Sequence, residues 1–350
     1  MEVRCSQRRS RTVRVRACDT LADMEKLAIV IVTYKRQQLL ETLFDSLLCL
    51  QTPPWRIILV DNEKSSETAL IAEAYQHLAR EFWGDPEPDA LGGTDRIVYF
   101  PQDENGGGAG GFSAGTGKAY ELGAEWFWLM DDDVAVEPDA IEKLSKWAER
   151  FDVVQGRRYN FNGEPFYWQY NFINFLGIPN PIAPGAFPSS GYKEMNTACF
   201  EGGLFKRSVV KQIGLPDPRF FIYWDDAMYG YLASKVTQGV AVSDFVMRRT
   251  RTIKNWDIAG VRKLNSTSDM NRYHIMRNRG YMMRYFQEQG DYNRFGFGLG
   301  TALTFGKEIT RIVMVDKGHF SSSAKALVRG WRDSRPIMRD PSWKPMPPLD

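Results

Sequence analysis

Apolar strand-like runs alternate with helix-like segments over roughly the first 130 residues, and this alternation restricts the fold more than any other feature. The run LAIVIVT (27–33) is β-branched and uninterrupted, which is typical of a strand buried on both faces. The segment QQLLETLFDSLLCL (37–50) places leucines at i, i+3 and i+4, the spacing of an amphipathic helix. The order predicts an α/β fold with a mostly parallel sheet and helices on both faces. The repeated patterns predict strands at 56–61, 96–100 and 125–130 and helices at 66–82 and from about 110 to 122.

Polar residues and glycines collect at the carboxyl ends of the predicted strands. Thr33 and Arg36 follow the first strand, Asp61 ends the second, and a glycine-rich loop follows the third. The fourth strand ends in three consecutive aspartates, 131–133. Because ligands of open parallel sheets bind at this edge, we expect the binding site here.

The loop after the third strand, DENGGGAGGFSAG (103–115), has the spacing G-x-G-x-x-G at Gly106, Gly108 and Gly111, with Asp131 about twenty residues later. This is the pattern of a dinucleotide-binding fingerprint. However, such a loop normally follows the first strand, and three adjacent carboxylates would repel a pyrophosphate unless a cation lay between them. Three interpretations stay open: a turn for close helix packing, a nicotinamide site, or a metal-bridged sugar nucleotide, which is favoured.

The strand in WFWLMDDDV (126–134) ends in adjacent carboxylates, which a divalent cation would neutralise. Asp131 and Asp133 project to the same side if strand geometry continues. Mg²⁺ or Mn²⁺ commonly binds one or two carboxylates together with substrate phosphates. The alternative is a solvated acidic turn in which Asp133 or Asp139 assists a helix that starts near Pro138. Next to the glycine loop, a metal site is favoured.

Several motifs occur in series: VTYKR, LVDN, NGGGAGGF, a strand ending in DDD, FEGGLFKRSVV and WDDAMYGYL. In this order they resemble an inverting family 2 glycosyltransferase of the GT-A fold over residues 27–285. The glycine loop and the WFWLMDDD strand are most similar to bacterial galactofuranosyltransferases, with rhamnosyltransferases close behind. The resemblance implies a catalytic domain over 24–285, with a nucleotide-binding half (24–135) and an acceptor half (136–285), followed by a helical C-terminal region (286–350).

The resemblance also implies roles for individual residues. Thr33, Arg36 and Asp61 would bind a UDP-sugar, with Asp61 facing the uracil. Asp131 and Asp133 would hold Mn²⁺ or Mg²⁺. On local sequence alone, Thr33 and Arg36 also fit a polar cap at a strand end, and Asp61 fits an ordinary turn. The nucleotide-sugar site implied in this way further includes Asn105, Gly107, Gly108, Asp131 and Asp132.

The stretch RFFIYWDDAMYGYL (219–232) places two carboxylates at the predicted start of a helix. Inverting transfer needs one carboxylate to remove the proton of the acceptor hydroxyl. The family motif implies that Asp226 is this base and that Asp225 is its neighbour. Aromatic neighbours such as Trp224 would raise the pKa of the base. The alternative is that both carboxylates cap the helix and interact with its dipole.

Two positions depart from the family pattern. Met228 stands where the family often has a second acid, and SDFVMRRTRT (243–252) has no His where related galactofuranosyltransferases supply a metal ligand. The metal site would then be completed by water and diphosphate, or Arg248 or Arg249 would help to hold the phosphates. Strict metal dependence therefore stays open.

The acceptor side is less well defined. Tyr167, Trp168 and Trp224 offer aromatic faces that stack on sugar rings, with local packing as the alternative. Beyond residue 285, two segments with basic and apolar faces predict helices. These helices fit a membrane interface, packing against the catalytic domain, or a dimer partner.

Charge and hydropathy narrow the location and partners. A net charge of +2 gives no concentrated basic face for nucleic acid. The first 23 residues hold six arginines and no apolar segment, so we expect a disordered basic tail or a true start at Met24. No uninterrupted apolar stretch of about 18 residues occurs, which predicts no spanning helix. We expect a cytoplasmic protein that contacts the inner face of the plasma membrane peripherally.

The combined prediction is an inverting glycosyltransferase that moves galactofuranose from UDP-galactofuranose to a lipid-linked or polysaccharide acceptor in cell-surface glycan synthesis. An alternative within the class is a rhamnosyltransferase that uses dTDP-rhamnose. Alternatives from other classes are a nicotinamide-dependent oxidoreductase and a non-catalytic sugar-nucleotide-binding protein. A homo-oligomer is compatible with all of them.

Overall fold

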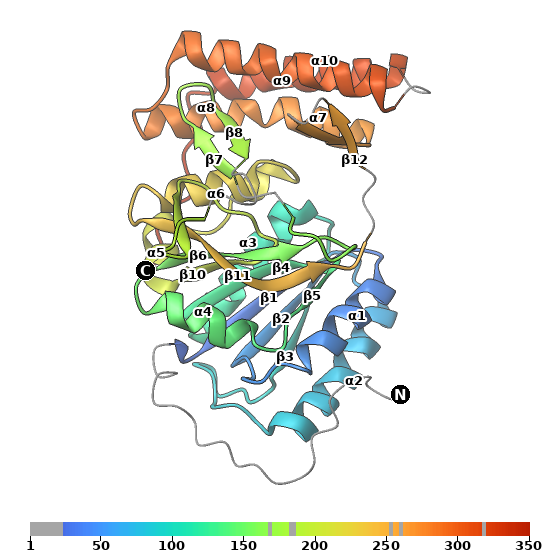
Figure 1. Cartoon of the computed structure of the whole chain (residues 1–350), viewed down its shortest axis with the longest axis vertical. Coiled ribbons are helices and arrows are strands. Elements are labelled where there is room, and N and C mark those ends of the chain that lie inside the picture. Colours follow the sequence, from blue (N-terminus) through green and yellow to red (C-terminus); the bar gives the residue numbers. More distant parts are fainter. Residues whose placement is uncertain (1–23, 167–169, 182–186, 252–254, 259–261, 317–319) are drawn as a thin grey trace.

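The computed structural model describes residues 24–166, 170–181, 187–251, 255–258, 262–316 and 320–350 (Figure 1). Its centre is a nine-stranded sheet in the order β3-β2-β1-β4-β10-β6-β11-β5, with β9 paired to β11. Two antiparallel pairs, β7–β8 and β12–β13, lie outside this sheet. The strands are β1 Leu27–Thr33, β2 Arg56–Asp61, β3 Ile97–Pro101, β4 Trp126–Asp131, β5 Val134–Val136, β6 Val153–Tyr159, β7 Tyr170–Ile173, β8 Ile178–Pro181, β9 Tyr192–Met195, β10 Gly203–Lys206, β11 Gly239–Arg249, β12 Asn255–Ile258 and β13 Arg262–Asn265.

Helices cover both faces of the sheet and form a separate layer at one end of the molecule (Figure 1). The helices are α1 Gln37–Leu47, α2 Ser66–Trp83, α3 Gly107–Leu122, α4 Ala140–Ala148, α5 Arg207–Ile213, a 3₁₀ turn at Pro218–Phe220, α6 Asp225–Ala233, α7 Asp269–Arg277, α8 Arg279–Glu288, α9 Arg294–Met314 and α10 Phe320–Arg339. The predicted α/β fold with flanking helices and a helical C-terminal region is confirmed.

The N-terminal half of the sheet is parallel, and its strand ends lie level with one another. β1 pairs in parallel with β2 on one side and with β4 on the other. In this register Thr33 is opposite Asp61, and Val32 is opposite Asp131. The ends of β1, β2 and β4 therefore meet at one edge, as the sequence predicts for the binding site. β10 enters antiparallel beside β4 and joins this half to β6 and β11.

The core has two layers because successive residues of each buried strand face opposite sides of the sheet. In β1, Ile29 and Ile31 pack in the layer beneath α1, α2 and α4. Ala28 and Val30 pack in the other layer, together with residues of α3 and α5. All residues of β1 are buried, as the β-branched run predicts.

Helix α3 lies directly on β1 and β2, and its glycines permit this contact. A Cβ on Gly111 would lie 2.4 Å from Val32 Cγ1, and one on Gly115 would lie 2.5 Å from Val30 Cγ1. Any side chain at these positions would push the helix off the sheet. The packing interpretation of the glycine run therefore accounts for these two positions.

The second half of the chain differs in detail from the sequence-based expectation. The predicted acceptor half (136–285) contains β6, the β7–β8 hairpin and β9, for which the sequence analysis predicts no strands. β6 and β9 pair with β11, which is distant in sequence, and β7 and β8 have only four residues each, so local periodicity gives little sign of them. α3 begins at Gly107, three residues before the expected start, and α1 ends at Leu47. None of the described helices has both the length and the apolar character needed to cross a bilayer.

Candidate active site

Asp132 joins the ends of β1 and β4. Its carboxylate accepts hydrogen bonds from Thr33 Oγ1 (2.8 Å) and from the Arg36 guanidinium (2.9 Å). Burial raises the pKa of the Asp132 carboxyl, and Arg36 is the strongest influence in the opposite direction. The structure therefore brings three of the predicted nucleotide-sugar residues into direct contact, and Asp132 fixes the position of Arg36.

Asp131 and Asp133 lie on either side of Asp132. β4 ends at Asp131 and the chain then turns, so strand alternation does not continue to Asp133. Burial, and then repulsion from Asp133 and Glu201, raises the pKa of Asp131 well above its usual range. Within the described part of the chain, no hydrogen bond reaches the Asp131 carboxylate. Asp133 Oδ2 lies 3.5 Å from Nη1 of Arg36 and 3.3 Å from Nη1 of Arg251.

Glu201 also belongs to this site, although the sequence analysis does not predict it as a site residue. It is buried in the turn before β10, and Nη1 of Arg158, on β6, lies 3.0 Å from its carboxylate. Arg249 donates to the same carboxylate from Nε (3.1 Å) and from Nη2. Burial opposes ionisation, but Arg249 and Arg158 outweigh it and lower the pKa of Glu201. The available signal was a charged residue inside the otherwise apolar run CFEGGLF.

Asp225 and Asp226 begin α6 but have different surroundings. Asp225 is buried and lines a small pocket with Asp217, Met228 and Tyr285. Burial, followed by repulsion from Asp226, raises the pKa of Asp225 to about 8. Asp226 is less buried, and burial raises its pKa to about 6. The alternative role at the helix start has a contact at Asp226, whose carboxylate accepts a hydrogen bond from the Ala227 N–H (2.6 Å) in the first turn of α6.

A chain of contacts connects Asp226 to Glu201. The Cys199 thiol donates a hydrogen bond to the Asp226 carboxylate, which partly offsets the effect of burial on its pKa. Nη1 of Arg158 donates in turn to Cys199 Sγ (3.2 Å) and is ion-paired with Glu201. The carboxylates of the DDD, FEGG and WDD motifs therefore act on one another at a single site.

The loop before α6 has an unusual backbone. Phe221, Tyr223 and Trp224 have φ values of 65°, 68° and 73°, a region that non-glycine residues rarely occupy. Trp224 Nε1 donates to the Ile275 carbonyl (3.0 Å), so its indole packs against α7. Asn278 is fully buried beneath the loop and donates to its backbone carbonyls. The helical layer formed by α7, α8, α9 and α10 thus holds the loop that presents Asp226.

Asp61 is buried at the end of β2. Its carboxylate accepts hydrogen bonds from the backbone N–H groups of Glu63 (2.9 Å) and Ser65 (2.8 Å) and from the Tyr99 hydroxyl (2.9 Å). Both oxygens therefore hold the following turn in place. The neighbouring Asn62 donates from Nδ2 to the Gly107 carbonyl (2.9 Å), which connects this turn to the glycine loop.

The glycine loop has two distinct positions before the packed part of α3. Gly107 has a φ of 69°, its N–H donates to Asn105 Oδ1 (2.9 Å), and a Cβ there would lie 2.1 Å from the Phe221 carbonyl oxygen. Gly108, by contrast, has no atom within 4 Å of an added Cβ. Gly107 is therefore needed by the protein itself, whereas the space beside Gly108 is open.

The residues present fit part of a divalent-cation site. Asp131 and Asp133 supply oxygen ligands of the type that Mg²⁺ and Mn²⁺ prefer. The Asp131 carboxylate is partly buried among like charges, whose repulsion an added cation would relieve. Among the described residues, no group of three or more His, Cys, Asp or Glu side chains is arranged to hold a cation by itself. A cation here would need ligands from a bound molecule or water.

The other predicted positions are less informative. Tyr167 and Trp168 lie outside the described residues. Met228, one of the two positions that depart from the family pattern, is buried in the pocket beside Asp225. Arg248 is exposed on β11, whereas Arg249 points inward to Glu201.

Comparisons with known proteins bear on the family and on the fold. A family model described as glycosyl transferase family 2 matches residues 28–214. The chain is 26% identical over 269 residues to galactofuranosyltransferase GlfT1 of Mycolicibacterium smegmatis, which covers 74% of this chain and 83% of that protein. The structure of Staphylococcus aureus TarS 1–349 covers 90% of this chain and 81% of that chain, with a TM-score of 0.53 and 11% identity. GalNAc-T7, solved with UDP, GalNAc and Mn²⁺, covers 93% of this chain and 59% of that chain, with a TM-score of 0.53 and 12% identity.

Proposed function

Because the chain belongs to glycosyl transferase family 2 and is a nucleotide-sugar glycosyltransferase, we propose that it transfers galactofuranose from UDP-galactofuranose with inversion. The proposed acceptor is a lipid-linked or polysaccharide glycan. The donor assignment is supported by the relative named galactofuranosyltransferase, which is 26% identical. The mechanism is supported by one observation above all: the carboxylates of three separate motifs act on one another at a single site.

Asp226 is the proposed base. In the transfer, the acceptor oxygen forms a bond to the anomeric carbon while the bond from that carbon to the diphosphate oxygen breaks. The acceptor proton passes to the Asp226 carboxylate, and the bonding electrons leave with the diphosphate. A pKa of about 6 keeps Asp226 mainly ionised near neutral pH and gives it more basicity than an ordinary carboxylate.

The donor is proposed to lie along the edge formed by β1, β2 and β4. Thr33 and Arg36 would contact the nucleotide diphosphate, with Asp132 holding Arg36 in place. Asp61 would face the base through the turn that it organises. The open space beside Gly108 allows a phosphate or sugar to approach the backbone. The set is completed by Asn105, Gly107 and Asp131.

Asp131 and Asp133 would hold a Mn²⁺ or Mg²⁺ ion. When bound, such an ion supplies positive charge that stabilises the departing diphosphate. Diphosphate oxygens and water would complete its coordination, since Mg²⁺ sites commonly combine one or two carboxylates with substrate phosphates. Arg36 and Arg251, which flank Asp133, would neutralise the remaining negative charge of the diphosphate.

The acceptor is proposed to approach Asp226 from the side of the helical layer. Trp224, Trp168 and Tyr167 are the proposed stacking residues for its sugar rings. Because transfer to a lipid-linked glycan takes place at a bilayer, the proposed location is the inner face of the plasma membrane. The protein would act there as a peripheral enzyme, alone or as a homo-oligomer.

A donor panel tests this function. The full chain is incubated with UDP-galactofuranose, UDP-galactopyranose, UDP-N-acetylglucosamine or dTDP-rhamnose, each with Mn²⁺, Mg²⁺ or EDTA, and nucleotide diphosphate release is measured. We expect release from UDP-galactofuranose that depends on a divalent cation. Faster release from dTDP-rhamnose would contradict the donor, and equal release in EDTA would contradict the metal. An Asp226→Asn variant that released diphosphate at the wild-type rate in the presence of acceptor would contradict the base.

A further inference from the structure

The exposed face of α9 is apolar along the whole helix. Phe295, Leu299 and Leu303 follow one another at intervals of four residues and are 84%, 54% and 51% exposed. Val313 and Met314 continue the same face and are about half exposed. Between them the exposed positions are glycine, alanine and threonine. Within the described span 294–314, Arg294 at the first position is the only largely exposed charged residue, and Lys307 is 27% exposed and ion-paired with Glu308 (3.2 Å).

The buried side of α9 carries the charges instead. Glu308 is fully buried and ion-paired with Arg311 (2.8 Å), which is also buried. A helix on the surface of a soluble protein normally shows the opposite arrangement, with its apolar side inward and its charges in water. A continuous exposed apolar face of this kind marks an interaction surface.

Helix α10 adds a basic face beside this apolar one. Trp331 and Val328 are partly exposed among the cations, and the Arg335 guanidinium stacks on the Trp331 ring at 3.9 Å. The only acidic residue of the described span 320–339 is Asp333, which accepts a hydrogen bond from the Tyr273 hydroxyl (2.9 Å). The exposed basic residues of α10 are Lys325, Arg329, Arg332, Arg335 and Arg339.

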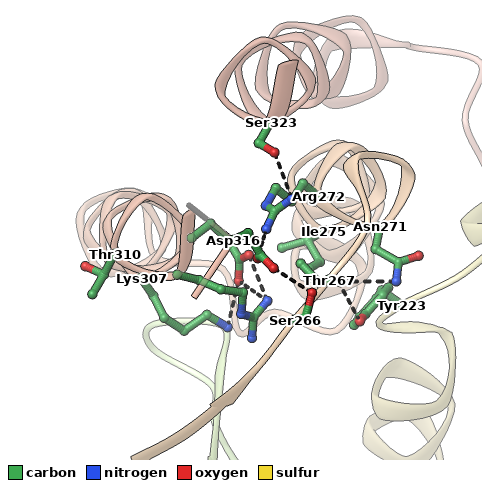
Figure 2. A network of polar contacts seen from close by, with 12 residues as sticks. Tyr223, Ser266, Thr267, Asn271, Arg272, Ile275, Lys307, Thr310, Asp316 and Ser323 are labelled. Atoms are coloured by element: carbon green, nitrogen blue, oxygen red, sulfur yellow. Dashed lines mark hydrogen bonds and ion pairs between the residues drawn. The ribbon is translucent and has the colours of Figure 1, made fainter. Parts of the chain in front are cut away.

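The two helices form a firm outer surface of the molecule. They lie at the end of the long axis opposite α2 (Figure 1). Figure 2 shows how Arg272 of α7 connects them. Its guanidinium is ion-paired with Asp316, which follows α9, and donates a hydrogen bond to Ser323 Oγ of α10 (3.0 Å). Ser266 donates to the same Asp316 (2.5 Å). These contacts hold the apolar face of α9 and the basic face of α10 in one fixed arrangement.

We propose that these faces of α9 and α10 form a docking surface for an anionic lipid bilayer. The apolar face of α9 would enter the interface between headgroups and acyl chains, and the basic face of α10 would bind the headgroup phosphates. Two copies of this chain packed on the same face would bring their two basic faces together, which opposes a dimer there. The surface therefore fits a partner that is apolar and negatively charged at once.

The orientation of the docked protein follows from the packing of the helical layer. α7 lies between the outer helices and the loop that presents Asp226, with Trp224 bonded to Ile275 of α7. Docking through α9 and α10 would place the acceptor side of the site toward the bilayer. The nucleotide-binding half would face the aqueous side, where a soluble sugar nucleotide is available.

Vesicle flotation tests the proposal without donor or acceptor. The full chain is mixed with vesicles of phosphatidylcholine alone or of phosphatidylcholine with phosphatidylglycerol. We expect strong flotation with the anionic vesicles only, and weaker binding as salt rises from about 50 to about 500 mM, since salt screens headgroup attraction. Absence of flotation at low salt, or equal flotation with neutral vesicles, would overturn the proposal.

Matched variants identify the surface. Leu299→Glu with Leu303→Glu should abolish flotation, whereas Leu70→Glu, at a position 66% exposed on α2, should leave it unchanged. Arg332→Gln with Arg339→Gln should weaken binding roughly 25-fold, because each basic residue near an anionic surface contributes roughly fivefold. Wild-type flotation by the Leu299/Leu303 variant would overturn the assignment. So would a concentration-dependent dimer in ultracentrifugation that the same variant abolishes.

Diphosphate release in solution is measured for every variant. The Leu299/Leu303 variant should lose flotation and keep full release. For the wild type, full release without flotation would overturn the docking surface and leave the proposed function intact. Flotation of the wild type without diphosphate release would overturn the proposed function and leave the docking surface intact.

Discussion

The side-chain amide of Asn278 lies 2.9 Å from the backbone carbonyl of Tyr223, two residues before the helix residue Asp225. The same nitrogen donates to the carbonyls of Phe220 (2.9 Å) and Ile222 (2.8 Å). A residue held in a sparsely populated backbone region costs on the order of 1 to 3 kcal/mol and persists only when its surroundings maintain it. Asn278 therefore maintains a strained loop whose next residues include the proposed base.

Replacing Asn278 by Ala should disturb the position of Asp226 without weakening the binding of the donor. We expect kcat to fall at least about tenfold with little change in the KM for the donor, because the loop relaxes and Asp226 moves while the β1–β4 edge stays intact. The pH dependence of kcat should also change, since the surroundings of Asp226 set its pKa. Steady-state kinetics over a pH series measures both quantities.

Asn271→Ala is the matched control, because Asn271 lies on α7, the helix directly before Asn278, and its side-chain amide donates to Thr267 Oγ1 (3.2 Å) and to none of the described loop carbonyls. Equal losses in both variants, or a loss at Asn278 that appears only as reduced thermal stability, would contradict the positioning role.

Asp225 and Asp226 should differ sharply in their effect on transfer. Asp226→Asn removes the proposed base and should lower kcat by about 100- to 10,000-fold. Asp225→Asn should reduce kcat by less than about tenfold, because its carboxyl lines a separate pocket beside Asp217 and Tyr285. Transfer to a water-soluble acceptor measures the two variants side by side. A larger loss of kcat for Asp225→Asn would indicate that Asp225, and not Asp226, is the base.

The same pair predicts how stability depends on pH. Burial raises the pKa of Asp225 to about 8, above the value of about 3.9 of an unfolded chain. A raised folded-state pKa means that the contribution to stability is fully present below about pH 4 and is lost as pH rises through about 8. Asp225→Asn should therefore have a higher Tm than the wild type near pH 8 and a smaller advantage near pH 5. Thermal unfolding at both pH values checks this, and a constant difference between the two proteins would contradict it.

Parallel strand pairing explains why part of the site could be predicted from the sequence. Thr33, Asp61 and Asp131 end three adjacent parallel strands, so their proximity follows from the β-α-β order. Glu201 could not be placed in this way, because it reaches Asp131 only through the antiparallel insertion of β10 between β4 and β6. Asn278 is an ordinary polar residue in a helical segment, and only tertiary packing brings it to the Tyr223 carbonyl.

The glycine loop shows the same limit in another form. The sequence motif at Gly106, Gly108 and Gly111 suggested one shared purpose. In the structure Gly111 serves packing against Val32, whereas Gly108 lies beside open space. The regularly spaced glycines of the motif therefore have different physical roles. The nicotinamide-dependent oxidoreductase interpretation of the motif is excluded because the chain belongs to glycosyl transferase family 2.

Asp131→Asn should stabilise the protein while weakening its response to metal. Without a cation, the partly buried Asp131 carboxylate is repelled by Asp133 and Glu201, so removing its charge should raise the Tm in EDTA by a few degrees, roughly 2 to 4 °C for each kcal/mol. Addition of Mn²⁺ with UDP should raise the Tm of the wild type, because a ligand that binds only the folded state stabilises it. The variant should lose most of this increase.

Asp95→Asn, which changes a carboxyl outside the site, is the control and should keep the full response to Mn²⁺ with UDP. An undiminished increase in the Asp131→Asn variant would rule out Asp131 as a ligand of the cation.

Gly107 and Gly108 give the last prediction, because the same Gly→Ala change should act through different causes at two adjacent positions. At Gly107 the added methyl would lie 2.1 Å from the Phe221 carbonyl oxygen, and a φ of 69° is unfavourable for Ala, so we expect a clear loss of thermal stability. At Gly108 no protein atom lies within 4 Å of the added methyl, so the fold should be retained. If the sugar diphosphate lies against this backbone, Gly108→Ala should raise the KM for the donor about tenfold with an unchanged Tm. A normal KM in a normally folded Gly108→Ala variant would show that the donor does not approach the loop, and the glycine run would then be explained by packing alone.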